Sequence, residues 1–302
     1  MLRLAVPTQA ETYERMQQPL AERDIEVEHI QTAERTVSLF DSGGGRPSGF
    51  EREFDVGFVF PPRLAEGGVA DALLGVPWVN GREEVLRSRQ KGETLARLSR
   101  AGVPVPNTVV VSNPVSEREL VETFEQFERP VVIKPNAATR GIGIAKATDV
   151  DSFLGICDYL DLVHDYRATG DRSFLVQEFL PNARDYRVML IDGEYVGAVE
   201  RRLSEPEHER GTSCEDGTNG KRWKHNVHRG ARATPVSLPD NLRTVAEHAA
   251  NALDIPWLGV DLLVTESRVV VNETNARPTI DAAEKYEDGF WDAVAALIRR
   301  QR

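Results

Sequence analysis

The sequence predicts a mixed α/β protein divided into packed lobes. Strand-like and helix-like segments alternate over residues 1–80, from LRLAV (2–6) to FDVGFVF (54–60), as in a small α/β lobe. From residue 173 onward, antiparallel-looking strands such as SFLVQEF and DYRVMLI dominate instead. A chain of 302 residues is also too long for one ordinary hydrophobic core. We therefore expect α/β and α+β lobes in succession.

Turn and helix-end signals divide the chain into three units. Residues 1–80 form an N-terminal α/β unit, whose glycine-rich connector DSGGGRPSG lacks the GK[ST] ending of a phosphate loop and is interpreted as a surface loop. Residues 81–172 begin with a helix over 81–100, which Gly102 and the following prolines end, and continue into a compact central lobe. Residues 173–302 form a C-terminal unit with antiparallel strands and a terminal helix.

Composition excludes several classes of protein. A net charge of −11 without a basic stripe argues against a partner held through nucleic-acid phosphates. No run approaches the roughly 20 apolar residues that a membrane span needs, so we expect a cytoplasmic protein without a membrane partner. The two cysteines, Cys157 and Cys214, are too few and too differently placed for a disulfide framework or a zinc cluster, and we expect free thiols.

The segment VVIKPNAATRGIGIAKA (131–147) favours phosphate binding. It places Lys134 at the end of a β-branched run, followed by a loop with Arg140, Gly141 and Gly143. Two strands joined by a small-residue loop can fold over phosphates, with backbone N–H groups and a lysine facing the anion. A surface hairpin with one solvated lysine explains this segment equally well when it is taken alone.

The segment FLVQEFLPNARDYRV (174–188) is typical of a strand that borders an adenine. A strand edge at Gln177, Glu178, Phe179 and Leu180 would offer backbone groups to the base, with apolar neighbours around the ring. Asp185 and Arg187 then alternate onto one face of the next strand. A cross-strand ion pair is the structural alternative for these two charges.

The run WKHNVHRG (223–230) is dense in hydrogen-bonding side chains. Arg229 suits an anion clamp, because a guanidinium can bind a phosphoryl group or an oxyanion through two hydrogen bonds. A metal site at His225 and His228 is disfavoured, since two histidines three apart on a strand face opposite sides and no carboxylate or cysteine cluster adjoins them.

Two apolar strands near the C-terminus predict a magnesium site. GVDLL (259–263) contains Asp261, and VVVNETNARP (269–278) contains Glu273 and Asn275, which share one face because they are two residues apart. Oxygen ligands from paired strands are what Mg²⁺ bridging ATP phosphates requires, and buried acids without a cation would be costly. Exposed acids at strand ends are the alternative.

Taken in order, Lys91, VVIKPNAATRGIGI, QEFL, DYR, HNVHRG, GVDLL and NETNARP resemble the ATP-grasp superfamily, in particular its RimK-type α-L-glutamate (amino-acid) ligases. The resemblance spans roughly residues 80 to 300. It implies an ATP-grasp fold, with an N-terminal pre-ATP-grasp α/β lobe, a small central α+β lobe and a C-terminal antiparallel-sheet lobe. It also implies an ATP-dependent ligase that joins a carboxylate to an amine through an acyl phosphate. Glutamate or another amino acid would be added to a protein C-terminus or to a small coenzyme.

The resemblance also assigns roles to individual positions. Lys91 and Lys134 would hold the ATP phosphates, and Arg229 would act with Lys134 on the reacting phosphoryl group. Two Mg²⁺ ions, with Mn²⁺ as an alternative, would be bound by Asp261, Glu273 and Asn275. The remaining nucleotide contacts would come from Gln177, Glu178, Phe179, Leu180, Asp185, Lys224, His225 and Asn226.

Three departures and three rival functions accompany this interpretation. The phosphate loop has fewer glycines than is usual, the stretch 203–221 is long, and Arg277 stands where a small residue is common, which could mark a different substrate contact. Arg187, Arg201 and Arg202 could bind an acidic acceptor, although solvated charge accounts equally well for Arg201 and Arg202. The rival functions are a kinase on the same fold, a non-catalytic nucleotide sensor and a structural partner-binding protein. The oligomeric state stays open, a homo-oligomer included.

Overall fold

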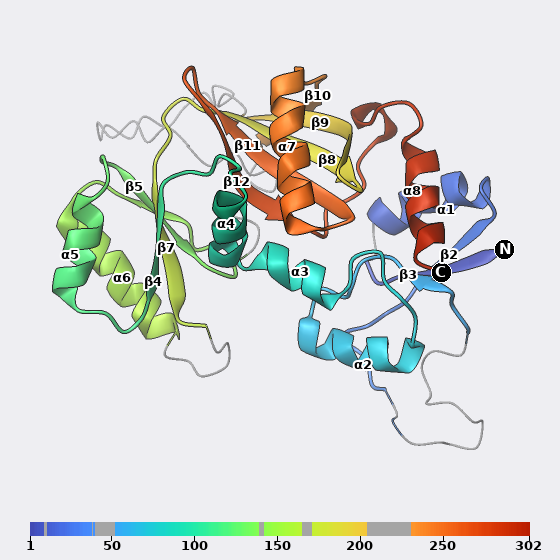
Figure 1. Ribbon diagram of the computed structural model, residues 1–302. Helices are drawn as coiled ribbons and strands as arrows, with labels where there is room; N and C mark the ends of the chain where they lie inside the picture. Colours follow the sequence, from blue (N-terminus) through green and yellow to red (C-terminus); the bar gives the residue numbers. More distant parts are fainter. Residues whose placement is uncertain (9–10, 38, 40–51, 139–141, 165–170, 204–230) are drawn as a thin grey trace, which may run out of the picture.

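The computed structural model describes residues 1–8, 11–37, 39, 52–138, 142–164, 171–203 and 231–302. Within these ranges the strands form three separate sheets, one at the N-terminus, one in the middle of the chain and one toward the C-terminus (Figure 1). This arrangement agrees with the mixed α/β architecture that the sequence predicts. No helix in these ranges is both long and apolar enough to cross a membrane.

The N-terminal sheet is parallel, with strand order β2-β1-β3. Its elements are β1 (Leu2–Val6), α1 (Glu11–Ala21), β2 (Ile25–His29), β3 (Val56–Gly57) and α2 (Leu64–Leu74). The apolar run 54–60 predicted a longer third strand. Val59 has a φ of 63°, which no extended strand accommodates, so pairing stops early.

The predicted helix over 81–100 is two helices, α3 (Arg82–Arg89) and α4 (Lys91–Arg100). Gln90 separates them with an extended backbone (φ −82°, ψ 93°). Asn136 caps the start of α4, since its carbonyl oxygen accepts from the Lys91 N–H at 3.1 Å and its Oδ1 accepts from the Gly92 N–H at 2.8 Å. The break therefore fixes the first residue of α4 against the loop that follows β5.

The central sheet is antiparallel, with strand order β4-β7-β5-β6. Its elements are β4 (Thr108–Ser112), α5 (Glu117–Glu125), β5 (Val131–Pro135), β6 (Ala145–Ala147), α6 (Val150–His164) and β7 (Ser173–Glu178). Helices α5 and α6 pack together through Phe124 and Phe153, whose ring centroids are 5.0 Å apart. Cys157 lies in this core as a free thiol, and burial raises its pKa to about 12.

Strand β7 corrects one boundary. The sequence placed residues 173–178 at the start of the C-terminal unit, but β7 pairs with β4 and β5 in the central sheet. Its four consecutive buried residues, of which only Gln177 is polar, suit an inner strand covered on both sides better than a strand that opens a new sheet. The division of the chain into three units otherwise remains a prediction.

The C-terminal sheet has five antiparallel strands in the order β10-β9-β8-β11-β12. Its elements are β8 (Arg184–Ile191), β9 (Glu194–Leu203), β10 (Ala231–Pro235), α7 (Asp240–Leu253), β11 (Trp257–Val264) and β12 (Val269–Asn275), followed by the 3₁₀ turn η2 (Ala283–Lys285) and α8 (Phe290–Arg300). Helix α7 lies across one face of this sheet (Figure 1).

One hydrophobic core joins the N-terminal and C-terminal sheets. It contains Leu4 and Met16 from the first lobe together with Trp257 and Leu297 from the last. Helix α8 consequently lies beside α1, and the two chain ends come close together (Figure 1). The central sheet has its own core, so α3 and α4 connect two independently packed bodies.

Candidate functional site

The charged residues of the site lie on the face of the C-terminal sheet that faces away from α7. Val260 and Leu262 point into the apolar core, so Asp261 between them points to the opposite face. The register pairs Asp261 with Glu273 on β12 and with Arg187 on β8. A row of three charged side chains therefore crosses β8, β11 and β12.

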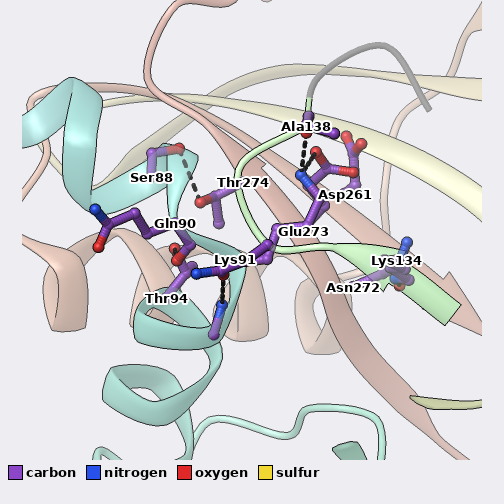
Figure 2. A network of polar contacts seen from close by, with 12 residues as sticks. Ser88, Gln90, Lys91, Thr94, Lys134, Ala138, Asp261, Asn272, Glu273 and Thr274 are labelled. Carbon is purple, nitrogen blue, oxygen red and sulfur yellow. Dashed lines mark hydrogen bonds and ion pairs between the residues drawn. The ribbon is translucent and has the colours of Figure 1, made fainter. Parts of the chain in front are cut away.

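Lys91 reaches this row from the start of α4. Its Nζ donates to Oε1 of Glu273 at 2.9 Å and to the carbonyl oxygen of Ala138 at 2.7 Å, and its side chain is 8% exposed. Figure 2 shows this lysine beside the carboxylates of Glu273 and Asp261. Lys91 therefore connects the start of α4 with the loop after β5 and with β12.

Lys134 enters the same region from β5. Its Nζ donates to Oδ1 of Asn272 at 2.9 Å (Figure 2). The β11–β12 register shifts between Asp261 and Leu262, so Asn272 is the extra residue of a bulge next to Glu273. Burial lowers the pKa of Lys134 to about 8; the charge of Lys91 adds to this, and the carboxylates of Glu273 and Asp261 oppose it.

Two arginines neutralise Asp261. Arg187 donates to both of its carboxylate oxygens, at 2.7 and 2.9 Å, and Arg201 lies 2.9 Å from Oδ2. Arg201 also binds Asp185 directly across the β8–β9 ladder. Burial favours the neutral carboxyl in both acids, yet the two guanidiniums hold the pKa of Asp261 at about 2, whereas burial and the neighbouring Asp261 charge raise the pKa of Asp185 to about 6.

This network decides between the alternatives for the charged pairs. Asp185 binds Arg201 and Arg187 binds Asp261, in each case across a strand ladder, as the cross-strand alternative expects. Arg201 is buried rather than solvated, whereas Arg202 is largely exposed and pairs with Glu200. Sequence reasoning thus underestimated Arg201. Arg201 lies two strands from Asp261 on the same face of the sheet. This position can be recognised only when the order of the strands is known.

Asn275 is less closely engaged with the acids. Its Oδ1 accepts from the backbone N–H of Arg277 at 2.9 Å. Within the described ranges, no three His, Cys, Asp or Glu side chains form a metal cluster, so a cation here would take two carboxylates and an amide oxygen. Two carboxylates facing each other across paired strands, with an amide on the same face, provide the hard oxygen donors that Mg²⁺ prefers.

The predicted adenine edge is an inner strand. β7 pairs on both sides as far as Glu178, so its backbone groups belong to the ladders and only Phe179 and Leu180 lie beyond them. Gln177 donates to Oγ1 of Thr108 at 2.9 Å, and Glu178 accepts from the Asn107 N–H and pairs with Arg268. Phe179 carries the Lys146 ammonium over its ring at 3.9 Å, which places an aromatic face and a cation at the strand end.

Several predicted residues lie outside the described ranges. They are Arg140, Gly141, Lys224, His225, Asn226, His228 and Arg229. Asn272 was not among the predicted site residues. Its available signal was a polar side chain between the apolar run 269–271 and Glu273.

Comparison with known proteins identifies the family. A family profile described as the RimK-like ATP-grasp domain matches residues 88–298. The chain belongs to this family. The match covers α4, both lysine-bearing segments and the strands that carry the charged row.

Named relatives of this RimK-like protein include a probable alpha-L-glutamate ligase of Aliivibrio fischeri, 31% identical over 222 residues that cover 70% of this chain and 64% of that protein. A ribosomal protein bS6--L-glutamate ligase of Escherichia fergusonii is 27% identical over 222 residues, with coverage of 70% and 64%. The match thus spans less than two thirds of the length of these relatives.

Solved structures support the fold. The ATP-grasp ligase PsnB complexed with minimal precursor superposes with a TM-score of 0.67 at 16% identity, covering 99% of each chain. A RimK domain ATP-grasp protein from Sphaerobacter thermophilus gives a TM-score of 0.64 at 22% identity, covering 99% of this chain and 98% of that one. The chain therefore has the ATP-grasp fold over nearly its whole length.

Proposed function

We propose that this RimK-like protein is an ATP-dependent carboxylate–amine ligase. The observation that carries the proposal is the meeting of Lys91 and Lys134, from two different segments, with the opposed carboxylates of Asp261 and Glu273. Membership in a family whose named relatives are glutamate ligases supports the same activity.

Amide formation from a carboxylate at neutral pH requires activation, because the carboxylate is a poor electrophile and its oxygen a poor leaving group. In the proposed reaction a carboxylate oxygen of the acceptor attacks the γ-phosphorus of ATP and ADP leaves. The amine of the second substrate then attacks the acyl carbon of the acyl phosphate, and inorganic phosphate leaves as the amine loses a proton. Lys91 and Lys134 would bind the phosphates, with Arg229 beside the transferring group.

The two magnesium ions of this proposal would be held by Asp261, Glu273 and Asn275. Bound there, the ions would neutralise phosphate charge during transfer, and Mn²⁺ is an alternative occupant. Arg187 and Arg201, which now neutralise Asp261, would then be available to other anions in the site. The adenine would lie at the end of β7, against Phe179 and Leu180, with Gln177, Glu178, Asp185, Lys224, His225 and Asn226 completing the nucleotide site.

The relatives' names favour glutamate as the amino acid that is added. A protein C-terminus or a small coenzyme would supply the acceptor carboxylate. The reaction would take place in the cytoplasm, where ATP is available.

A kinase on the same fold is the second candidate. ADP release that requires an amino acid favours the ligase, whereas a stably phosphorylated acceptor favours the kinase.

Glu273→Gln tests the proposed function. The variant keeps the shape of the side chain and removes its charge, and its partner Lys91 is only 8% exposed, so we expect the free energy of unfolding in urea to fall by about 1 to 3 kcal/mol, with the protein still folded. ATP-dependent addition of an amino acid to a carboxylate acceptor, followed by mass spectrometry, should fall at least about 100-fold because the proposed magnesium site loses one of its two carboxylates. Arg229→Ala should behave in the same way.

Retention of wild-type turnover in either variant would count against the ligase assignment. Glu117→Gln, on the exposed surface of α5, is the matched control and should leave both stability and turnover unchanged.

A further inference from the structure

Two arginines meet at the junction between the end of β12 and the N-terminal lobe. Arg277 is the second residue after β12, and its Nη2 donates to Oγ1 of Thr8 at 2.9 Å. Arg89 is the last residue of α3, and its Nη2 donates to the carbonyl oxygen of Pro62 at 2.9 Å. Thr8 and Pro62 both lie beyond the carboxyl ends of parallel strands, β1 and β3, the edge at which open α/β sheets bind ligands.

Neither arginine has an acidic partner within the described part of the chain. Arg277 donates to a hydroxyl and Arg89 donates to a carbonyl oxygen, and both acceptors are neutral. Nη1 of Arg277 is buried and finds no hydrogen-bond partner among the described residues. The two arginines are neighbours, because the N–H of Ala276 donates to Oγ of Ser88 at 3.0 Å, and these are the residues directly before Arg277 and Arg89. Like charges in a partly buried place, with one donor unused, are costly unless an anion joins them.

A purely structural role explains only part of this arrangement. To hold the segment after β12 against the N-terminal lobe, the single hydrogen bond from Arg277 to Thr8 would be sufficient. It would not need a second arginine at Arg89, and it leaves the inward Nη1 donor unexplained. Arg187 and Arg201, on strands of the C-terminal sheet, each bind a carboxylate, in contrast to Arg277 and Arg89.

We infer that Arg277 and Arg89 bind a carboxylate of the substrate at this junction. A planar guanidinium matches a carboxylate through two parallel hydrogen bonds, which would use the free Nη1 donor. Arg277 is four residues beyond Glu273, at most about 13 Å of extended chain, so a small substrate can reach from the reacting centre to this pair. The inference rests on the proposed function, because it assigns the carboxylate to a ligase substrate.

The carboxylate has two chemical sources, the α-carboxylate of the incoming amino acid or a second carboxylate on the acceptor. Two probes separate them. L-glutamate carries a free amine and represents the incoming amino acid, whereas N-acetyl-L-glutamate has a blocked amine and can enter only as a carboxylate acceptor. Calorimetry would measure the binding of each probe to the full chain with Mg²⁺ and a non-hydrolysable ATP analogue present.

Arg277→Gln and Arg89→Gln are the test variants, and Arg118→Gln is the control, since Arg118 is 84% exposed on α5. We expect each test variant to bind one of the probes roughly tenfold or more weakly, while its affinity for the nucleotide analogue stays within about twofold of wild type. Loss of L-glutamate binding assigns the pair to the amino acid, and loss of N-acetyl-L-glutamate binding assigns it to the acceptor. Arg118→Gln should match wild type throughout.

Arg277→Lys is a milder variant that distinguishes a lost carboxylate contact from a folding defect, because it keeps the positive charge and loses only the planar guanidinium. We expect it to bind the same probe more weakly than wild type. Test variants that bind both probes as tightly as wild type would overturn the inference, as would wild-type protein that binds the nucleotide analogue but neither probe. Wild-type protein that binds no nucleotide would instead refute the proposed function, and with it the assignment of this carboxylate to a ligase substrate.

Discussion

The pKa of each buried acid in the site is set by its burial and by the charges around it. Asp185 and Asp261 lie in the same buried network, yet their pKa values move apart, to about 6 and about 2. The guanidiniums of Arg187 and Arg201 act on both acids. They outweigh burial at Asp261, whereas burial and the charge of Asp261 outweigh them at Asp185.

The lowered pKa of Lys134 predicts how Mg·ATP affinity depends on pH. Its pKa in the folded protein is about 8, below the unfolded value of 10.5, so between these values the unfolded chain holds the extra proton. An ATP phosphate favours the protonated lysine, and we therefore expect Mg·ATP affinity to be highest below pH 8 and to fall by up to about tenfold per pH unit above it. Calorimetry across pH 7 to 10 measures this.

Lys134→Arg is the control for this titration, because a guanidinium stays charged throughout that range. Its affinity should lack the change of slope near pH 8. An identical profile in this variant would assign the titration to another group.

At the scale of elements, the site depends on interruptions of regular structure. The break at Gln90 places Lys91 at the start of α4, and the bulge at Asn272 turns that amide toward Lys134. A second connection comes from Asn80, which is fully buried and donates to the carbonyl oxygens of Trp257 and Ala276 at 2.6 and 2.7 Å. Asn80 thus joins the start of β11 to the residue that follows β12.

Asn80→Ala should be strongly destabilising. The substitution leaves two buried carbonyl oxygens and the Trp257 N–H, which now donates to Oδ1 of Asn80, without partners. We expect a loss of about 3 kcal/mol in the free energy of unfolding, measured by urea denaturation. Gln126→Ala, which removes one exposed side-chain contact on α5, should cost less than about 0.5 kcal/mol. Equal effects of the two substitutions would show that the Asn80 connection contributes little.

Over the whole molecule the protein is acidic, whereas the nucleotide in the proposed function is an anion. The chain carries a net charge of −11, but four cations converge at the site, Lys91, Lys134, Arg187 and Arg201, against three carboxylates. This local excess of positive charge favours a polyanion, although the two opposed acids Asp261 and Glu273 would repel unscreened phosphates.

Removal of divalent cations should therefore weaken ATP binding. At a Mg·ATP concentration about 100 times the dissociation constant, linkage predicts a rise in melting temperature of about 5 °C. With ATP and excess EDTA we expect most of this rise to disappear, because the carboxylates then face the phosphates without a screening cation. Comparison of the two melting curves checks the expectation, and an equal rise in both would contradict a metal site at Asp261 and Glu273.

Local patterns in the chain were sufficient to predict the fold and the family. The strand-like segment 2–6 is β1, the apolar segments that begin at Val131 and Gly259 lie in β5 and β11, and ordered motifs led to the ATP-grasp family, because both signals depend on near neighbours along the chain. The partners of the charged residues could not be predicted in this way. Arg201 meets Asp261 only because β8 lies between their strands, and Arg277 meets Arg89 only because β12 ends beside α3. Strand order and register bring these residues together across long separations in sequence, and packing of the whole chain sets both.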